Sequence, residues 1–591
     1  MKVPYLLSAT GKGFTPGLVG GNAAIFGYSG RSIGDWMSGG TPQKGELTQT
    51  TLIGPGTNNP KQGIWPSDKN NVAPAVGFAW SPKWWGQDKT TIRGGYQIAY
   101  QLPGNSLSWI DVDAGNLPGF FYEPTDLGNG TFRDFANMTI PLEVKQKPFE
   151  VIPITQRAQA TAIFDPNYVT PYVLTSNVTL DIRYIGTRGM KLAGSYNLND
   201  ADIRNNGLFQ ALEVTRAGGN APVFDRMLNG LNLGTGIGVV GRDVTGSEAL
   251  RRHASFRTDI ANGNFVAVAR TLSTTNIGTV QPPLTNAGLL RSSGLFPPNF
   301  IVTNPQFANI TYRTNSDSSN YHSLQTQLTL RPTRGIQYQA TYTWSRSLGV
   351  DSNGSGGLGV FRDLLNRNGD YSLLSSNRSH DFRSYGTFEL PFGPGKLLGG
   401  NTSGLAARVI EGWKVGTIVN MTSGAPLNIV GMTTLYNLGT PDVVSTFPRE
   451  GGVVWPANPA DAFGNFFGQQ YKRVQDPACG SVASNLTQWC TLNALADANG
   501  NVVLRNAAPG QLGTLGLRPI EGPGSWSFDA NVQKSIRVHE SRNLTFRLDA
   551  SNVFNHPTPG NPNLSINAGT FGQITTKTGQ RSLQALVRFD F

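Results

Sequence analysis

The last eleven residues, RSLQALVRFDF, alternate between two kinds of side chain. In an extended strand one face would be apolar, and it would consist of Leu583, Ala585, Val587, Phe589 and Phe591. The opposite face would be polar apart from Leu586. This period of two predicts a β-strand with different surroundings on its two sides. Because chain ends in water usually fray, an aromatic last residue indicates surroundings that cover it.

The same alternation recurs upstream, in segments separated by turn-forming residues. The clearest examples are WSFDANVQKSIRV (526–538), NLTFRLDASNVFN (543–555), HSLQTQLTLRP (322–332) and IQYQATYTWSRSL (336–348). The last two are joined by PTRG, which is short enough for a hairpin turn. About ten such segments are recognisable, and the weak signal of a single barrel strand implies that there are more.

The composition favours strands and turns over helices. The chain has 591 residues with 72 Gly and 37 Pro, only 14% of its residues are charged, and 10% are aromatic. Strands are enriched in aromatic residues, and turns in Gly and Pro. A chain of this length holds either several domains or one large architecture that grows by adding strands. The recurring alternation favours the second, so the predicted fold class is all-β.

Several features place these strands in a membrane. No stretch approaches the roughly 18 to 20 consecutive apolar residues of a membrane-spanning helix, which excludes a helical membrane protein but not a barrel. Aromatic residues gather toward strand ends, as an interfacial girdle would, at Tyr338, Tyr342, Trp344, Trp526 and Phe528. We therefore predict a transmembrane antiparallel β-barrel whose polar face surrounds a wet lumen.

Tight turns alternate along the chain with two long inserts, at about residues 200–300 and 430–520. Both inserts are rich in Asn, Gly and Pro and show no clear strand pattern. Short turns at one end and long extracellular loops at the other are typical of outer-membrane barrels. Within the first insert, SEALRRHASFRTDIANGNFVAVARTL (247–272) predicts a small helical insert.

Two cysteines, Cys479 and Cys490, stand at the ends of the loop-like stretch CGSVASNLTQWC. The residues between them are enough to close a disulfide, which suits an oxidising compartment. Two thiols are too few for a structural zinc site. A local loop disulfide is the favoured interpretation, and free thiols remain the alternative.

The sequence gives no positive sign of nucleic-acid binding or of catalysis. The net charge of +11 comes from dispersed Lys and Arg residues, which suit a solvated surface or anionic lipid better than nucleic acid. GIGVVG (236–241) lacks the strand and the acidic residue of a dinucleotide site, and DANGN (497–501) lacks the spacing of a calcium loop. We therefore expect no catalytic residue, no cofactor and no metal ligand, and we classify the chain as not an enzyme. The histidines are scattered, at His253, His322, His380, His539 and His556.

Several stretches, taken in order, resemble the barrel of the Oar-like TonB-dependent transporters. They are DKNNVAPAVGFAWSP with TTIRGGYQIAY, FDPNYVTPYV with YIGTRGMKL, NYHSLQTQLTLRPTRGIQYQATYTWSRSL, RSHDFRSYGTFELPFGPGK, EGWKVGTIVNMTSGAPLNI and RLDASNVFNHPTPGNPN. Single phrases are weak, but their order across residues 68–591 makes the resemblance specific.

The resemblance implies a plugged outer-membrane transporter, a type with about 22 strands. Residues 1–67 are expected to be an N-terminal stretch before the first clear strand, and residues 68–591 a barrel portion of about 12 to 16 strands. The signal peptide and the plug of such transporters are not recognisable here. The chain is therefore expected to be a fragment, with a smaller closed barrel or pairing with another chain as alternatives.

These inferences lead to one functional hypothesis and one alternative. The hypothesis is solute uptake across the outer membrane of a Gram-negative bacterium, with TonB acting only through a plug missing from this chain. The expected partners are outer-membrane lipid or lipopolysaccharide, an unknown extracellular substrate and the barrel-assembly machinery. That machinery would recognise Phe591 and the apolar residues that alternate before it, as the resemblance implies. The alternative is a surface adhesion or secretion barrel that binds partner proteins through its loops. A secreted all-β enzyme such as a propeller would need a repeat of about 40 to 50 residues, and none is present.

Overall fold

A computed structural model describes most of the chain after residue 172. It covers residues 69–82, 92–100, 172–179, 182–274, 288–291, 294–333, 335–350, 361–363, 366–436, 438–447, 451–456, 463–468, 470–539 and 542–591, with short pieces at 6–7, 13–18, 33–39, 41, 50–53, 161–164, 169 and 449. In the described ranges, no helix is both long and apolar enough to cross a bilayer.

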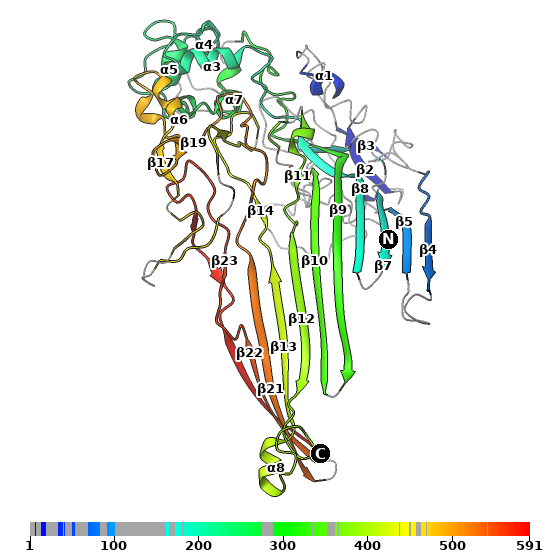
Figure 1. Cartoon of the computed structure of the whole chain (residues 1–591). Coiled ribbons are helices and arrows are strands. Elements are labelled where there is room, and N and C mark those ends of the chain that lie inside the picture. Colours follow the sequence, from blue (N-terminus) through cyan, green and yellow to red (C-terminus); the bar gives the residue numbers. More distant parts are fainter. Residues whose placement is uncertain are drawn as a thin grey trace, which may run out of the picture.

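One large sheet of 13 strands dominates the structure (Figure 1). Its main path runs in the order β26-β22-β21-β13-β12-β10-β9-β8-β7-β5-β4, while β11 pairs with β10 and β6 pairs with β9. The strands are β4 (Ala75–Trp80), β5 (Ile92–Tyr100), β6 (Thr161–Phe164), β7 (Tyr172–Thr179), β8 (Ile182–Asn197), β9 (Ile310–Thr333), β10 (Ile336–Val350), β11 (Ser372–Leu373), β12 (His380–Glu389), β13 (Trp413–Thr422), β21 (Ser525–His539), β22 (Arg542–Ser551) and β26 (Ser582–Asp590). The β6–β9 pair is parallel and the other pairs are antiparallel, which confirms the predicted antiparallel barrel fold.

The apolar residues of neighbouring strands share one face of this sheet. Directly opposite residues of an antiparallel pair point to the same side, so the register shows which side chains meet. Leu583 of β26 lies opposite Ala550 of β22, which lies opposite Ala530 of β21. Further along the same strands, Phe589 lies opposite Leu544. The alternation in the sequence thus becomes a continuous apolar surface.

This apolar face is not covered by a second layer of protein. On β9, Leu328 is 54% exposed, and on β26, Val587 is 64% exposed. Water-soluble proteins rarely expose a large contiguous apolar surface, whereas a barrel presents one to lipid. The opposite face carries ion pairs along single strands, such as Arg547 with Asp549 at 2.7 Å and Arg588 with Asp590 at 2.6 Å. We call these the lipid-facing and lumen-facing sides of the sheet.

Aromatic residues mark the end of the lipid-facing side that lies toward the long loops. Trp344 is exposed there, two residues from Tyr342, whose hydroxyl lies 2.7 Å from His380 Nδ1. On β21 the ring of Trp526 stacks on that of His556, with centroids 4.3 Å apart. Rings with a polar edge suit a membrane interface. Two of the scattered histidines therefore contribute to an aromatic girdle.

The two ends of the sheet differ as expected. At one end the turns are tight, because only two residues separate β7 from β8 and only two separate β9 from β10. At the other end the long connections fold above the strands (Figure 1). They contain α3 (Leu208–Arg216), α4 (Pro222–Leu228), α5 (Gly246–Arg252), α6 (Ala254–Asn262), α7 (Phe265–Thr274) and the 3-10 helices η2 (Leu289–Arg291), η3 (Arg367–Asp370), η4 (Pro477–Ser481) and η5 (Thr487–Trp489). The predicted helical insert is confirmed by α5 to α7, and α3 and α4 extend it.

The second insert and the connection between β22 and β26 contain more strands than their sequence pattern indicates. A four-stranded sheet is built from β15 (Asp442–Val443), β17 (Lys472–Gln475), β18 (Asn493–Ala496) and β19 (Val502–Arg505). Two-residue strands pair as β14 (Pro426–Leu427) with β20 (Ile520–Glu521), β16 (Gly464–Asn465) with β24 (Gln573–Ile574), and β23 (Thr558–Pro559) with β25 (Lys577–Thr578). These strands are too short for alternation to show, so the sequence pattern missed them. DANGN forms the turn between β18 and β19.

Much of the N-terminal stretch 1–67 lies outside the described residues. Its described pieces include a three-stranded sheet of β1 (Leu6–Leu7), β2 (Gly13–Leu18) and β3 (Thr50–Ile53), and the short helix α1 (Ile33–Met37). One further helix, α8 (Gly404–Ile410), lies between β12 and β13 at the end of the sheet opposite the long loops (Figure 1). Strands therefore occur before residue 68, where the sequence analysis identified no clear one.

An arginine on the lipid-facing side should prevent stable insertion, whereas its neighbour on the lumen-facing side should tolerate one. Leu328→Arg would place a charge in hydrocarbon at a cost of about 2 to 4 kcal/mol, while Thr329→Arg would place it in the lumen. We expect L328R to lower the free energy of unfolding of the full chain in lipid vesicles by this amount, measured by urea titration. T329R is the matched control, since both residues are exposed. Equal losses for the two variants would contradict the assignment of the two sides.

Candidate functional site

The end of the sheet that carries the long loops holds a body assembled from two distant parts of the sequence. Helices α3 to α7 share one apolar core with Cys479, Leu486, Cys490 and Leu492 of the second insert. Among the described residues, the largest fully buried side chains include Phe224, Phe256 and Phe265 of these helices. We call α3 to α7 together with residues 476–492 the loop body. Two inserts that are separate in the sequence thus form a single packed unit.

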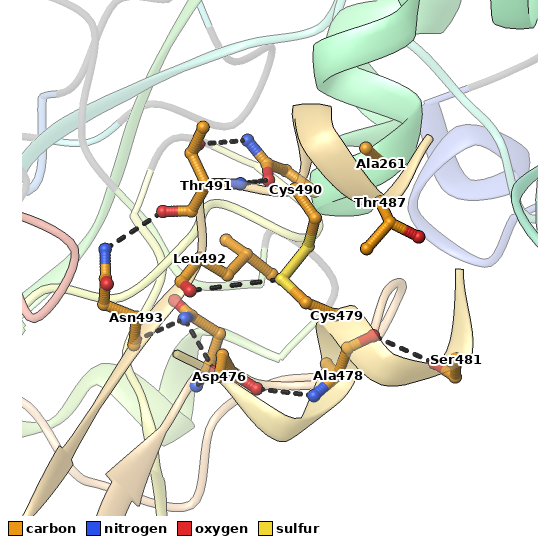
Figure 2. The surroundings of a disulfide bond; sticks show 12 residues. Ala261, Asp476, Ala478, Cys479, Ser481, Thr487, Cys490, Thr491, Leu492 and Asn493 are labelled. Atoms are coloured by element: carbon orange, nitrogen blue, oxygen red, sulfur yellow. Dashed lines mark hydrogen bonds between the residues drawn. A yellow bond between two sulfur atoms is a disulfide. The ribbon is translucent and has the colours of Figure 1, made fainter. Parts of the chain in front are cut away.

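A disulfide joins Cys479 to Cys490 within the loop body (Figure 2). The Cα atoms of the two cysteines lie 5.7 Å apart. Just before the bridge, Asp476 Oδ1 accepts a hydrogen bond of 2.9 Å from the amide of Ala478. The bridge closes a loop whose side chains face α6, so it restricts the unfolded chain and fixes the segment that contacts the helices.

Polar contacts hold this bridged loop against the helices. Arg216 at the end of α3 donates to the carbonyls of Ala261 at 3.0 Å and Ala478 at 3.1 Å. Asn262 and Thr491 exchange two hydrogen bonds, of 2.8 and 3.0 Å. Arg257 lies over the ring of Trp489, 3.4 Å from its centroid. These contacts satisfy polar groups that would otherwise be buried unpaired, and Arg257 adds a cation–π contact.

The strands of the second insert form a neighbouring core with its own buried polar centre. Asp476 is almost fully buried, and its Oδ2 accepts from the amide and the side chain of Asn506 at 2.8 and 2.9 Å. Asn567, from the connection between β22 and β26, accepts from the amide of Asn493 at 2.8 Å. A fully satisfied network of this kind fixes the relative position of its segments. It links the second insert to the last long connection of the chain.

A pocket lies beneath the loop body, near the mouth of the lumen. Its cavity volume is about 40 Å³, and its lining residues are Trp36, Gly39, Asp200, Ala201, Asp202, Ile203, Arg204, Asn205, Leu435 and Tyr436. They come from α1, from the connection after β8 and from the second insert. Trp36 is held by a 2.8 Å hydrogen bond from its indole nitrogen to Thr303 Oγ1.

Carboxylates, a guanidinium and aromatic rings meet in this pocket. Arg204 forms an ion pair with Asp363 at 3.7 Å and lies 5.8 Å from the ring centroid of Tyr436. Asp200 is paired with Arg270, yet burial raises the pKa of Asp200 above its usual value. Burial also raises the pKa of the Tyr436 hydroxyl, which stays protonated and can donate a hydrogen bond. The lining therefore offers hydrogen-bond donors, acceptors and ring faces to a small polar group.

More ion pairs surround the base of the pocket. Arg362 binds Asp370 at 3.0 Å, and Arg367 binds Asp317 at 2.5 Å. Arg367 also lies over the ring of Phe361, 4.4 Å from its centroid. The Arg362–Asp370 pair lies within the connection between β10 and β12, and the Arg367–Asp317 pair anchors that connection to β9. Over the described part of the chain, no cluster of three or more His, Cys, Asp or Glu could hold a metal ion.

The apolar residues of the predicted assembly signal lie together along β26, at the end of the sheet. Leu583, Ala585, Val587 and Phe589 face the lipid side opposite β22, and Phe591 follows with 95% of its surface exposed. The rings of Phe589 and Phe591 stack with centroids 6.2 Å apart. In the described residues, β26 pairs with β22 alone. The chain ends at the short-turn end of the sheet, beside α8 (Figure 1).

The family model of the outer membrane beta barrel domain matches residues 22–584. The chain belongs to this family. This outer membrane beta barrel protein therefore lies in the outer membrane of a Gram-negative bacterium, with the long loops outside. The predicted fold class and location are confirmed.

Solved structures of outer-membrane proteins resemble the chain only distantly. They include the outer membrane transporter YddB from Escherichia coli (TM-score 0.35, 9% identity, 92% of this chain and 42% of that chain) and P. aeruginosa FpvA bound to heterologous pyoverdines (0.28, 8%, 92% and 35%). A third is the ferric enterobactin receptor PfeA from Pseudomonas aeruginosa in complex with enterobactin (0.28, 8%, 88% and 41%). The chain spans less than half the length of each of these proteins. No curated protein matches it.

The sequence analysis missed the pocket. Trp36, Asp202 and Tyr436 are far apart in the chain and share no motif. Only the fold of the two inserts brings the last two together, and that fold depends on contacts such as those of Arg216 and Asn262. The run of Asn and Asp after β8, NLNDADIRNN, is the one local signal that could have pointed to a polar site.

Acidification should loosen the loop body through His253. The buried ring of His253 lies between α5 and α6, and its Nδ1 accepts a 3.1 Å hydrogen bond from the amide of Ser255. Burial and the nearby Arg257 lower the pKa of His253 below its usual value of 6.5. A lowered histidine pKa gives stability that is present above the unfolded pKa and lost as pH falls below it. We expect faster proteolysis within residues 200–274 at about pH 5 than at about pH 8.

The variant His253→Asn tests this interpretation. Asparagine can cap α6 but does not titrate, so H253N should lose most of the acceleration by acid. H322N, on the lipid-facing side, is the control and should keep it. Burial raises the pKa of Asp259, so its protonation in acid favours the folded state, opposite to the effect of His253. Asp259 is present in both the wild type and H253N, so the difference between them reports on His253. An unaltered pH response in H253N would show that another group is responsible.

Proposed function

We propose that this protein takes up a polar solute across the outer membrane, as a transporter of the TonB-dependent type. The observation that carries the proposal is the pocket at the mouth of the lumen, whose lining residues come from separate connections. Loops that close over a polar pocket are suited to capturing a solute before it enters the lumen. The lumen-facing ion pairs, such as Arg547 with Asp549, provide a wet path behind it.

The ordered resemblance to Oar-like transporters supports the same role. In the proposal, residues 68–591 form the barrel portion, and the inserts at about 200–300 and 430–520 are its extracellular loops. Energy from TonB would act through a plug inside the lumen.

Uptake by cells carrying pocket variants tests the proposal. The gene would be deleted in its native host, and the medium compared by mass spectrometry for solutes that the mutant leaves behind. We expect the intact gene to restore depletion of such a solute. Asp202→Asn should reduce it because it removes a negative charge from the lining, and Tyr436→Phe because it removes a hydroxyl donor. Depletion should also stop when the proton gradient is collapsed.

A matched control is Asp497→Asn, which makes the same chemical change in the exposed turn between β18 and β19. D497N should deplete the solute like the wild type. The competing function is adhesion or secretion through partner proteins. A deletion strain that depletes every solute normally but fails to attach to surfaces or other cells would favour that function and overturn uptake.

We also propose that Phe591, with Leu583, Ala585, Val587 and Phe589, is read by the barrel-assembly machinery. The apolar residues are presented on a single face of a strand whose second edge has no strand partner among the described residues. Deleting Phe591 from the intact gene should lower the amount of heat-modifiable barrel in outer-membrane fractions, while Phe591→Trp should preserve it. Unchanged assembly after the deletion would contradict the assignment.

A further inference from the structure

Helix α8 lies on the outer, lipid-facing side of the sheet at its periplasmic end. It belongs to the connection between β12 and β13, which is far longer than the neighbouring turns at that end. Figure 1 shows it beside the C-terminus, away from the loop body. The family has short turns at the periplasmic end, so a helix in this position needs a physical reason.

Two lipid-facing side chains bind the end of α8. Lys534 of β21 lies in register between Trp413 and Phe546, so its side chain starts on the lipid-facing side. Its Nζ donates to the carbonyl of Arg408 at 2.6 Å and to the carbonyl of Glu411. The indole nitrogen of Trp413 donates to the carbonyl of Val409 at 2.9 Å. These carbonyls are the ones that a helix leaves unsatisfied at its C-terminus.

This arrangement explains a lysine that breaks the apolar alternation. A lysine facing lipid is costly unless it reaches the interface or a partner. Here Lys534 is almost fully buried, 5.6 Å from the ring centroid of Trp413, with helix carbonyls around its ammonium group. The favourable interaction of a cation with a helix C-terminus adds to the hydrogen bonds. The lysine thus fastens α8 to the outside of the barrel wall.

The side of α8 that points away from the wall is apolar. Leu405 is 87% exposed and Val409, one turn later, is 65% exposed. Leu397, in the segment before the helix, is 85% exposed. Ala407, by contrast, is buried. Charged groups near the helix are paired with one another, as Arg408 is with Glu411 at 3.3 Å. The helix therefore presents apolar side chains beyond the edge of the sheet, continuous with the lipid-facing side.

We propose that α8 is an interfacial helix that inserts Leu405 and Val409 into the periplasmic phospholipid leaflet of the outer membrane. The helix lies against the lipid-facing side of the sheet, which already contacts lipid. Lipid is therefore the partner that its exposed apolar side chains would meet. A short amphipathic segment buries its apolar side chains at the level of the headgroups and the first acyl carbons. The mixed charges of Lys396, Arg408 and Glu411 suit zwitterionic headgroups. In this position α8 would fix the depth of the β12–β13 edge in the membrane.

Fluorescence quenching by lipid tests this proposal in the full chain. Because Cys479 and Cys490 are joined, Leu405→Cys provides the single free thiol for an environment-sensitive dye. The labelled protein would be folded into phosphatidylethanolamine and phosphatidylglycerol vesicles that contain lipids brominated near the headgroup end of the acyl chain. We expect loss of most of the dye emission for L405C. Leu295→Cys, on the extracellular connection and 58% exposed, is the matched control and should keep its emission.

Quenching at Leu405 no greater than at Leu295 would overturn the proposal. Quenching that appears only at high protein-to-lipid ratio, and without brominated lipid, would indicate a second copy of the chain as the occupant and would also overturn it.

A second pair of variants tests how α8 is held. Trp413→Phe keeps an aromatic ring but removes the hydrogen bond from the indole nitrogen to the carbonyl of Val409. Lys534→Met removes both hydrogen bonds from the ammonium group to the end of α8. Each should reduce the quenching of L405C by shallow brominated lipid in protein that retains its heat-modifiable migration. Lys414→Met, which alters an exposed lysine paired with Glu389 at 2.9 Å on the lumen-facing side, should leave it unchanged. Full quenching in both W413F and K534M would overturn the fastening role of these residues.

Discussion

The absence of hydrogen-bonding partners in hydrocarbon is the constraint on which this structure depends. Every backbone N–H and C=O group that enters the membrane must be paired within the protein, and an antiparallel ladder achieves this between strands. The ladder leaves side chains free to divide between two sides, and the register from β4 to β26 keeps the division consistent. The apolar side meets lipid and the polar side meets the lumen. The same constraint explains Lys534, whose ammonium group binds helix carbonyls instead of facing lipid alone.

The extracellular end follows different rules because it is wet. There the inserts build ordinary cores, with Phe224 and Phe256 buried among helices and Asp476 held by Asn506. These cores join connections that leave different strands, so they also hold the mouth of the lumen in shape. The pocket lined by Asp202 and Tyr436 exists only because both inserts fold together. The membrane-spanning sheet and the pocket are thus linked through packing of the loops.

Alternation made the strands predictable because each strand has two different environments. The segments around Leu328 and Trp344 were identified from their own residues, and the helical pattern at 247–272 predicted α5 to α7. The four-stranded sheet of the second insert was missed because strands such as Asn493–Ala496 are too short to show a period. The contacts of Arg216 and the pocket around Arg204 depend on residues far apart in the chain, which no local pattern contains. Lys534 interrupts the apolar alternation of β21, and the contacts that explain it come from the distant helix α8.

The central claim is that one side of the sheet faces lipid and the other faces a wet lumen. Single spin labels at successive positions of β22, from Leu544 to Asp549, would test it most directly in lipid vesicles by their accessibility to oxygen and to a polar nickel complex. The account predicts a period of two, with oxygen favoured at Leu544, Phe546 and Leu548 and nickel favoured at the positions between them. Accessibility that does not alternate, or nickel access equal on both sides, would contradict it.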